Sequence, residues 1–436
     1  MAPGQKPPNG HGPHGPSPII PGRPGRPSFS LDALRELVER QFAEETANRA
    51  DILLELDDAE KRRALIAEIA DYVLAVEAIT LAPADRRRIV EQAYRNLFTF
   101  GPLEPLLQDE RVTEIVIDGP YQVRARWGLG KLQATAITFD DAYHLEGVLQ
   151  RALSTVGAAL RPDSPFLELG VELMGRTARI SVASPPVSAQ YMLEVRLHPR
   201  QPLTLEALAE RGALSVQVIA LLRAVVQGGH GLLIVGEAGT GKTTLAAALS
   251  HALPADAPAL AVERAAEMHL PPHIAPHLPA PPTPQAPAQP FGDALSAALA
   301  EAPAWLLVDE VRGDDEAAAL WDALTRADPP RYLWTFRAPP QPERLKAALG
   351  MAIRRAAPAA PQAAINRALA ERLPFVITLR REGERARVET VAEWEAREEG
   401  EALALRPLLR AQGTGWALTG ALPQHELPLP ASWWQG

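Results

Sequence analysis

The chain of 436 residues contains no cysteine. Structural disulfides and metal sites built on thiolates are therefore excluded, because both need cysteine sulfur. This composition fits a reducing compartment, and we expect a cytoplasmic location.

Long apolar runs are also absent. No uninterrupted apolar stretch approaches the roughly 18 residues of a membrane-spanning helix. The N-terminus also lacks the hydrophobic stretch of a signal peptide. We therefore expect no direct insertion into a membrane.

Basic residues are outnumbered by acidic residues. Lys and Arg number 44 against 53 Asp and Glu, which gives a formal net charge of -9 and a sequence pI of about 5.7. Such a balance is a poor electrostatic footprint for a nucleic-acid binder, and we expect no nucleic-acid partner.

Proline and glycine dominate residues 1–30, which contain no acidic residue. A segment of this composition buries too little apolar surface to offset the entropy of ordering, so it predicts a disordered arm. Residues 31–100 have helical periodicity, with Ser30 as a candidate N-cap and Pro83 opening the third helix. The three predicted apolar stripes are Leu31, Leu34, Val38 and Phe42, then Ile66, Ile69, Val73 and Val76, and finally Ile89, Val90, Ala93 and Leu97.

Residues 101–201 predict a compact α+β domain with an antiparallel sheet, because short alternating runs surround one helical stretch at 140–156. The expected strands are 112–118, 121–127, 132–138, 166–174, 176–182 and 191–197. Residues 202–214 are interpreted as a linker that leads into a helix at 215–227.

Residues 215–395 alternate between apolar strands and helices, which predicts a doubly wound parallel sheet. We expect a long irregular loop at 271–290, which holds nine prolines, and a C-terminal extension at 396–436. The expected strands are 231–235, 259–263, 304–310, 331–336 and 374–380.

The segment GEAGTGKTT (236–244) directly follows the apolar run GLLIV and satisfies the phosphate-loop pattern G-x-x-x-x-G-K-[ST]. Its glycines let successive backbone N–H groups face phosphate at a helix N-terminus. Lys242, one of only five lysines, would reach the β- and γ-phosphates, and Thr243 would offer its hydroxyl to Mg²⁺. The predicted nucleotide-binding residues here are Gly236, Gly239, Thr240, Gly241, Lys242, Thr243 and Thr244.

The run AWLLVDE (304–310) has the form of a Walker-B strand. We expect it on a strand neighbouring the one before the phosphate loop. Asp309 would hold Mg²⁺ through water, and Glu310 would polarise the attacking water. Glu263 ends another strand, at the sheet edge where ligands bind, but a solvated strand-end acid is an equally open interpretation.

The order of GPLEPLL, VTEIVIDGP, PLTLEAL, GEAGTGKTT, VERAAEMHL and DEVRG resembles the CpaF-like secretion ATPases over roughly residues 95–395. These are hexameric motors of tight-adherence pili and of type II and type IV secretion. The resemblance implies an α/β protein with a RecA-like P-loop NTPase domain. A small α+β, PAS-like domain and a helical bundle would precede it, and ATP would bind with Mg²⁺ at a subunit interface.

The resemblance also assigns residues and partners. It places Glu263 in an acidic box and Glu310 in Walker B as catalytic residues, and it places Arg179 and Arg196 at basic positions that face nucleotide. It implies a homo-hexamer, with a mixed ring as the alternative, and an inner-membrane platform protein as partner. The protein would then be cytoplasmic and peripheral to the inner membrane.

Several positions depart from the family pattern. Asp309 stands where the family has Gly, Arg264 where it has Asp, and Arg337 where it has His. Residues 265–311 contain no Lys or Arg, although a finger arginine raises NTPase rates by about 10³–10⁵. Arg337, or Arg264 from a neighbouring subunit, is a possible substitute.

Two functions remain open on these grounds. The first is a motor ATPase of secretion or pilus assembly, and the second is a catalytically weakened, nucleotide-binding structural or regulatory subunit. The acidic balance disfavours a third, a DNA translocase.

Two other sequence patterns are interpreted without assigning them a functional role. His269, His273 and His277 have metal-like spacing, but intervening prolines break any helix that would align them, which favours loop histidines. Trp433 and Trp434 are expected to pack or to make a terminal contact.

Overall fold

The computed structural model describes Ile20 and residues 29–48, 58–312, 314–383, 385–397 and 402–435. The predicted N-terminal arm lies outside these residues, apart from Ile20, Phe29 and Ser30. The chain divides into two compact units. The first comprises Met1–Trp127, Lys131–Phe166 and Val182–Val195, and the second comprises Gly128–Gly130, Leu167–Ser181 and Arg196–Gly436.

The first unit begins with three packed helices, α1 (Leu31–Asn48), α3 (Ala59–Glu77) and α4 (Pro83–Phe98). The predicted N-cap is confirmed, since the Ala33 N–H donates to Ser30 Oγ at 3.1 Å. The first apolar stripe is wholly buried. In α3, however, Val76 is 45% exposed, so its assignment to the core was wrong. Residues 70, 74 and 77 complete the buried face instead, at the i, i+4 and i, i+3 spacings of one helix face.

The predicted α+β region contains a six-stranded sheet in the order β3-β2-β1-β6-β5-β4. The pairs β1–β2 and β2–β3 are antiparallel, as predicted. Strand β3 has only two residues, against the seven expected. The elements are η1 (Gly101–Leu103), α5 (Glu104–Gln108), β1 (Val112–Asp118), β2 (Val123–Trp127), β3 (Gln133–Ala134), α6 (Ala142–Ser154), β4 (Phe166–Leu173), β5 (Arg176–Ala183) and β6 (Met192–Leu197).

The second unit is built around a nine-stranded sheet in the order β15-β14-β13-β12-β7-β11-β10-β8-β9. The strands from β12 to β9 are parallel, and β13, β14 and β15 continue the sheet antiparallel. These strands are β7 (Leu232–Gly236), β8 (Ala259–Val262), β9 (Ile274–His277), β10 (Trp305–Val308), β11 (Arg331–Arg337), β12 (Phe375–Glu382), β13 (Arg385–Arg397), β14 (Ala402–Gln412) and β15 (Gly415–Leu418).

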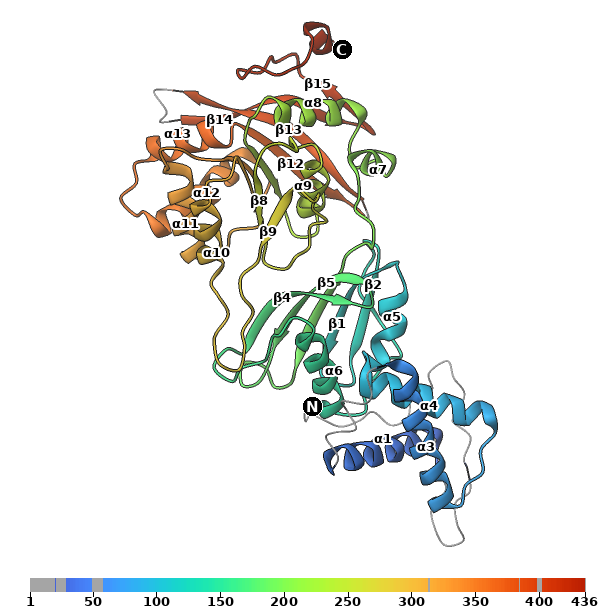
Figure 1. Ribbon diagram of the computed structural model, residues 1–436. Coiled ribbons are helices and arrows are strands. Elements are labelled where there is room, and N and C mark those ends of the chain that lie inside the picture. The colour runs from blue at the N-terminus through green and yellow to red at the C-terminus, as the bar shows by residue number, and fades with distance from the viewer. Residues whose placement is uncertain are drawn as a thin grey trace. The chain divides into compact units, whose positions relative to one another are not determined.

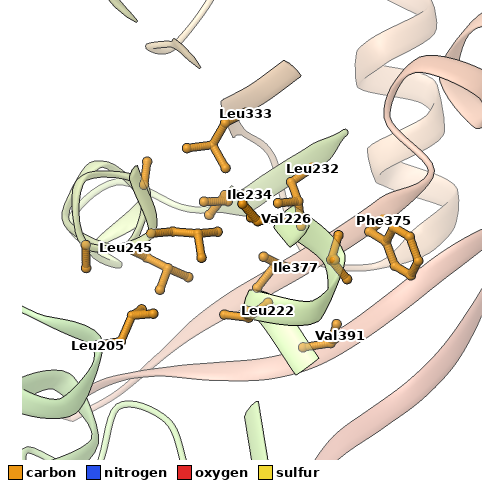
Figure 2. Packing of buried hydrophobic residues seen from close by; sticks show 14 of the residues in the cluster. Leu205, Leu222, Val226, Leu232, Ile234, Leu245, Leu333, Phe375, Ile377 and Val391 are labelled. Atoms are coloured by element: carbon orange, nitrogen blue, oxygen red, sulfur yellow. The ribbon is translucent and has the colours of Figure 1, made fainter. Parts of the chain in front are cut away.

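Helices cover both faces of this sheet (Figure 1). Successive residues of a strand point to opposite faces, so a strand buried on both faces supplies both cores. Helices α7, α8 and α9 pack with one set, which includes Leu232 and Ile234 (Figure 2), and α10 to α13 pack with the set that includes Leu233 and Val235. The helices are α7 (Leu205–Glu210), α8 (Val216–Gln227), α9 (Lys242–Ser250), α10 (Phe291–Ala300), α11 (Asp314–Thr325), α12 (Pro342–Ala356), α13 (Gln362–Arg372) and the short η3 (Ala431–Gln435).

The predicted fold class is confirmed: an α/β, RecA-like domain with a parallel sheet, together with a helical bundle and an α+β region. The PAS-like likeness of that region stays a prediction, as do the domain boundaries. The predicted linker 202–214 contains the helix α7, capped by Thr204. Trp433 and Trp434 pack against the core in a T-shaped pair with centroids 4.7 Å apart.

Two predictions about this sheet were wrong. The Walker-B strand β10 does not neighbour β7, because β11 lies between them. The segment 271–290 is not wholly irregular, because it contributes the edge strand β9. Proline is compatible with an edge strand, since a missing N–H can face away from the ladder.

Among the described residues, no helix is both long enough and apolar enough to cross a bilayer.

Candidate functional site

The phosphate-loop segment connects the end of β7 to the start of α9, and its glycines are required by geometry. Gly239 and Gly241 have φ angles of 73° and 82°, a region that L side chains rarely adopt. A Cβ at Gly236 would overlap the Thr240 hydroxyl and come within 3.0 Å of the Leu379 carbonyl oxygen. A Cβ at Gly241 would meet no atom within 4 Å, so the space beside the loop is open there.

Lys242 begins α9 and is only 6% exposed. Its Nζ donates to the Glu237 carbonyl at 3.1 Å, and the Thr240 hydroxyl donates to the same oxygen at 2.9 Å. Burial lowers the pKa of Lys242, while the nearby carboxylates of Glu310 and Asp309 act in the opposite direction. The amine therefore sits desolvated inside the loop, where a phosphate would be its strongest partner.

The first turn of α9 also leaves donors for an anion. Its N-cap is Gly241, which offers no side-chain hydrogen bond to the first N–H groups. Thr243 and Thr244 are half-buried in this turn. All seven residues predicted for the loop thus lie in one strand–turn–helix unit.

Asp309 follows β10 and is 4% exposed. Its Oδ1 faces two hydroxyls, that of Thr243 at 3.5 Å and that of Thr335 at 3.2 Å. Thr335 lies on β11, the strand between β7 and β10, and the sequence did not single it out. This group of hydroxyl and carboxylate oxygens has the chemistry that suits Mg²⁺, so the residues present fit the predicted metal.

Glu310 lies beside the same loop. Its carboxylate is close enough to favour the charged form of Lys242, and it is 3.6 Å from Arg312 Nη2. Arg312 also pairs with Glu168 of β4 at 3.0 Å. The predicted catalytic carboxylate of Glu310 therefore lies near two cations, Lys242 and Arg312.

Glu263 is buried rather than solvated, being 1% exposed at the end of β8. Its Oε2 accepts the Met268 N–H at 2.7 Å. Burial raises the pKa of Glu263 to about 8, and the negative charges of Asp309 and Glu267 add to the rise. The group consequently holds a proton at neutral pH.

Arg179 and Arg196 lie with acidic partners in the same unit. Arg179 Nη1 is 2.9 Å from Glu267 and 3.5 Å from Glu168. Arg196 is near enough to lower the pKa of Glu267, although burial dominates and raises that pKa to about 7. The sequence did not single out Glu267 either. Only the three-dimensional structure shows that Glu267 lies near Arg179 and Arg196.

The three spaced histidines diverge. His269 Nε2 is 2.8 Å from the Pro199 carbonyl, and His277 Nε2 is 3.0 Å from Glu301. Across the part of the chain that the structure describes, no group of three or more His, Asp or Glu side chains could hold a metal ion.

Comparison with known proteins identifies the region around this site. Residues 130–326 match the family model described as Type II/IV secretion system protein. A Mycobacterium tuberculosis protein named "Putative conjugal transfer protein" is 32% identical over 172 residues, which cover 38% of this chain and 49% of that protein. The type IV secretion system protein PtlH of Bordetella pertussis is 27% identical over 50% of this chain and 70% of its own length. The chain thus spans about half the length of the first of these relatives.

Among solved structures, the VirB11 ATPase from Brucella suis is 20% identical, with a TM-score of 0.35, over 69% of this chain and 97% of that one. The matched region 130–326 contains the phosphate loop, Glu263 and the Asp309–Glu310 pair. The match to the type II/IV secretion system protein family therefore covers the residues of the candidate site.

Proposed function

We propose that this protein binds ATP with Mg²⁺ at the phosphate loop and hydrolyses it as a motor subunit of a secretion or pilus-assembly system. The observation that carries the proposal is the convergence of Lys242, Thr243, Asp309 and Glu310, which come from the segments that follow β7 and β10, two strands that are not neighbours in the sheet. A phosphate cradle without catalysis would not need a second acid beside the first.

Each residue of the site has a distinct role in this proposal. The N–H groups of the glycine-rich loop and Lys242 would hold the phosphates, and Thr243 and Asp309 would hold Mg²⁺, which neutralises charge on the phosphates when it is bound. Glu310 would orient and polarise the attacking water. Glu263, neutral at pH 7, would act as a hydrogen-bond donor within the site and not as its base.

Arg179 and Arg196 are proposed to contact nucleotide as well. In the present structure Arg179 forms ion pairs with Glu267 and Glu168. Binding of a phosphate by Arg179 would therefore compete with these carboxylates. The competition predicts that nucleotide affinity rises when Glu267 is neutralised.

The same proposal extends to assembly. The names of the relatives, type IV secretion system proteins and a conjugal transfer protein, support a role in a secretion system. Within it we propose a homo-hexamer of the CpaF-like kind, with a mixed ring as the alternative. Its partner would be an inner-membrane platform protein, which would place the ring at the cytoplasmic face of the membrane. No nucleic acid is required.

The test is steady-state ATP hydrolysis by the purified oligomer with Mg²⁺, with nucleotide binding measured in parallel. Lys242→Ala should abolish binding. Glu310→Gln should preserve binding and lower turnover by on the order of 10²-fold or more. If the wild type and Glu310→Gln hydrolyse ATP equally slowly, the proposed motor function is refuted.

A second function has its own supporting observation. The segment 265–311 holds no Lys or Arg to offset charge on a transferred phosphoryl group, and the Arg337 side chain is exposed at the end of β11. A weakened, nucleotide-gated subunit would bind ATP tightly and show negligible turnover. Its cellular function would survive Glu310→Gln but not Lys242→Ala.

A further inference from the structure

Arg264 directly follows Glu263, and its guanidinium is largely buried. The side chain is 16% exposed and lies over the ring of Phe291 in α10, 4.5 Å from the ring centroid. A guanidinium buried to this extent needs acceptors for its N–H groups, since it cannot lose its charge.

Those acceptors come from the turn that follows β10. Nε and Nη2 of Arg264 donate to the main-chain carbonyl of Glu310 at 3.3 and 3.2 Å. Nη2 also pairs with Oε1 of Glu316 in α11, whose side chain is 6% exposed. The other oxygen of that carboxylate accepts the main-chain N–H of Arg312.

These contacts fix both ends of the three-residue turn 310–312. The Arg264–Glu316 pair holds the carbonyl of Glu310 at one end and the amide of Arg312 at the other. Between them, the Val311 side chain is 8% exposed and packs in the core. Because both ends and the middle are fixed, the backbone of this turn has little freedom, and the direction of the Glu310 side chain follows from it.

We propose that Arg264 is a positioning residue: together with Glu316 it clamps the turn 310–312 so that the Glu310 carboxylate faces the phosphate loop. This inference rests on the proposed hydrolysis, in which Glu310 orients water. It also assigns the Arg264 guanidinium to its own chain, and not to the nucleotide of a neighbouring subunit.

Four variants separate positioning from a merely structural role. Arg264→Met removes the donors and keeps an alkyl chain over Phe291, while Arg264→Lys keeps the charge but loses the forked geometry. Glu316→Gln keeps an acceptor for the Arg312 amide and removes the ion pair. The double variant, Arg264→Met with Glu316→Gln, removes both charges together, and a folded core tolerates this better than one unpaired charge. Arg344→Met, at an exposed site on α12, is the matched control.

The first measurement is kcat and KM for ATP. Misplacement of Glu310 should lower kcat roughly 10–100-fold and leave KM within about threefold in Arg264→Met and in the double variant. Arg264→Lys should fall between these and the wild type, and Arg344→Met should match the wild type. Rates are expressed per bound nucleotide, so a loss of folded protein cannot mimic the effect. An unchanged kcat per bound nucleotide in the double variant would overturn the proposal.

The second measurement is hydrogen exchange of the Arg312 amide with nucleotide absent. It should exchange at least about tenfold faster in Arg264→Met than in the wild type, because the carboxylate that accepts it loses its anchor. The same rate in both would show that no clamp exists. If the wild type hydrolyses no ATP, the proposed function fails, while this exchange rate still decides whether the clamp is real.

Discussion

The Thr335 hydroxyl donates a hydrogen bond of 3.2 Å to Oδ1 of Asp309, and both side chains are buried. The strand β11, which carries Thr335, separates the phosphate-loop strand from the Walker-B strand. The intervening strand thus supplies the group that orients the predicted metal-binding carboxylate toward Thr243.

Thr335→Val is therefore expected to weaken the Mg²⁺ dependence of nucleotide binding. The substitution preserves shape and removes the hydrogen bond, which leaves one lone pair of a buried carboxylate unsatisfied, at a cost of about 1–3 kcal/mol. The apparent Mg²⁺ affinity for the nucleotide complex should fall on the order of tenfold, measured by titration. Thr378→Val, at a buried threonine of β12, should leave it unchanged. A loss of equal size in both would assign the effect to general packing.

Glu263→Gln should change the pH dependence of stability. The folded pKa of about 8 is raised above the ordinary value of 4.5, so the folded state binds the proton more tightly than the unfolded state. The free energy of unfolding then falls as pH rises from about 4.5 toward 8 and levels off above, by at most about 1.4 kcal/mol per pKa unit. The amide cannot ionise, and it still accepts from the Met268 N–H.

The variant should accordingly match the wild type near pH 5 and be the more stable protein near pH 9. Thermal unfolding of both proteins at these two pH values measures whether the difference in stability appears only at the higher pH. A constant difference at both would mean that Glu263 is ionised throughout.

Gly236→Ala should collapse the phosphate loop. The new methyl group would press on the Thr240 hydroxyl and on the Leu379 carbonyl of β12, and the second of these is backbone. We expect nucleotide affinity to fall at least about tenfold and stability by about 1–3 kcal/mol. Isothermal titration with ATP measures the first. Gly415→Ala, where the nearest atom is 4.0 Å away, should affect neither, and wild-type affinity in Gly236→Ala would contradict the geometry.

Glu393→Ala should release the C-terminal segment from the sheet. Glu393 is 0% exposed, pairs with Arg406 at 3.1 Å, and accepts the N–H groups of Gln424 and His425 at 2.7 and 2.9 Å. Removing a buried partner of this kind costs about 3–5 kcal/mol. Limited proteolysis between residues 419 and 430 should accelerate. Glu389→Ala, which removes a partly exposed ion pair of the same strand, should cost about 0–1 kcal/mol and leave cleavage unchanged.

The predictions that succeeded depend on neighbours in sequence. The glycine-rich loop lies within nine consecutive residues, and its two positive φ angles fall at Gly239 and Gly241. Likewise, Ser30 caps α1 through the N–H three residues away. The strands β7, β8, β10, β11 and β12 were predicted because a strand buried on both faces is a short, continuous apolar run.

The strands that the sequence analysis did not predict form by pairing with other strands. Strand β9 is short and contains Pro276, so it has no pattern of its own and forms only because β8 offers an open edge. The strands β13, β14 and β15 carry mixed polar and apolar residues and gain their hydrogen bonds from one another and from β12.

The sequence by itself determined that this chain has a phosphate cradle, an acidic pair after an apolar strand, and an α/β framework, because each is encoded within one turn or one strand. The tertiary structure alone decided that Thr335 donates to Asp309, that Glu263 is buried with a raised pKa, and that Arg264 donates to the carbonyl of Glu310. Strand order and burial create those relationships. They arise from the packing of segments about 26 to 52 residues apart, and no local pattern records which segments will meet.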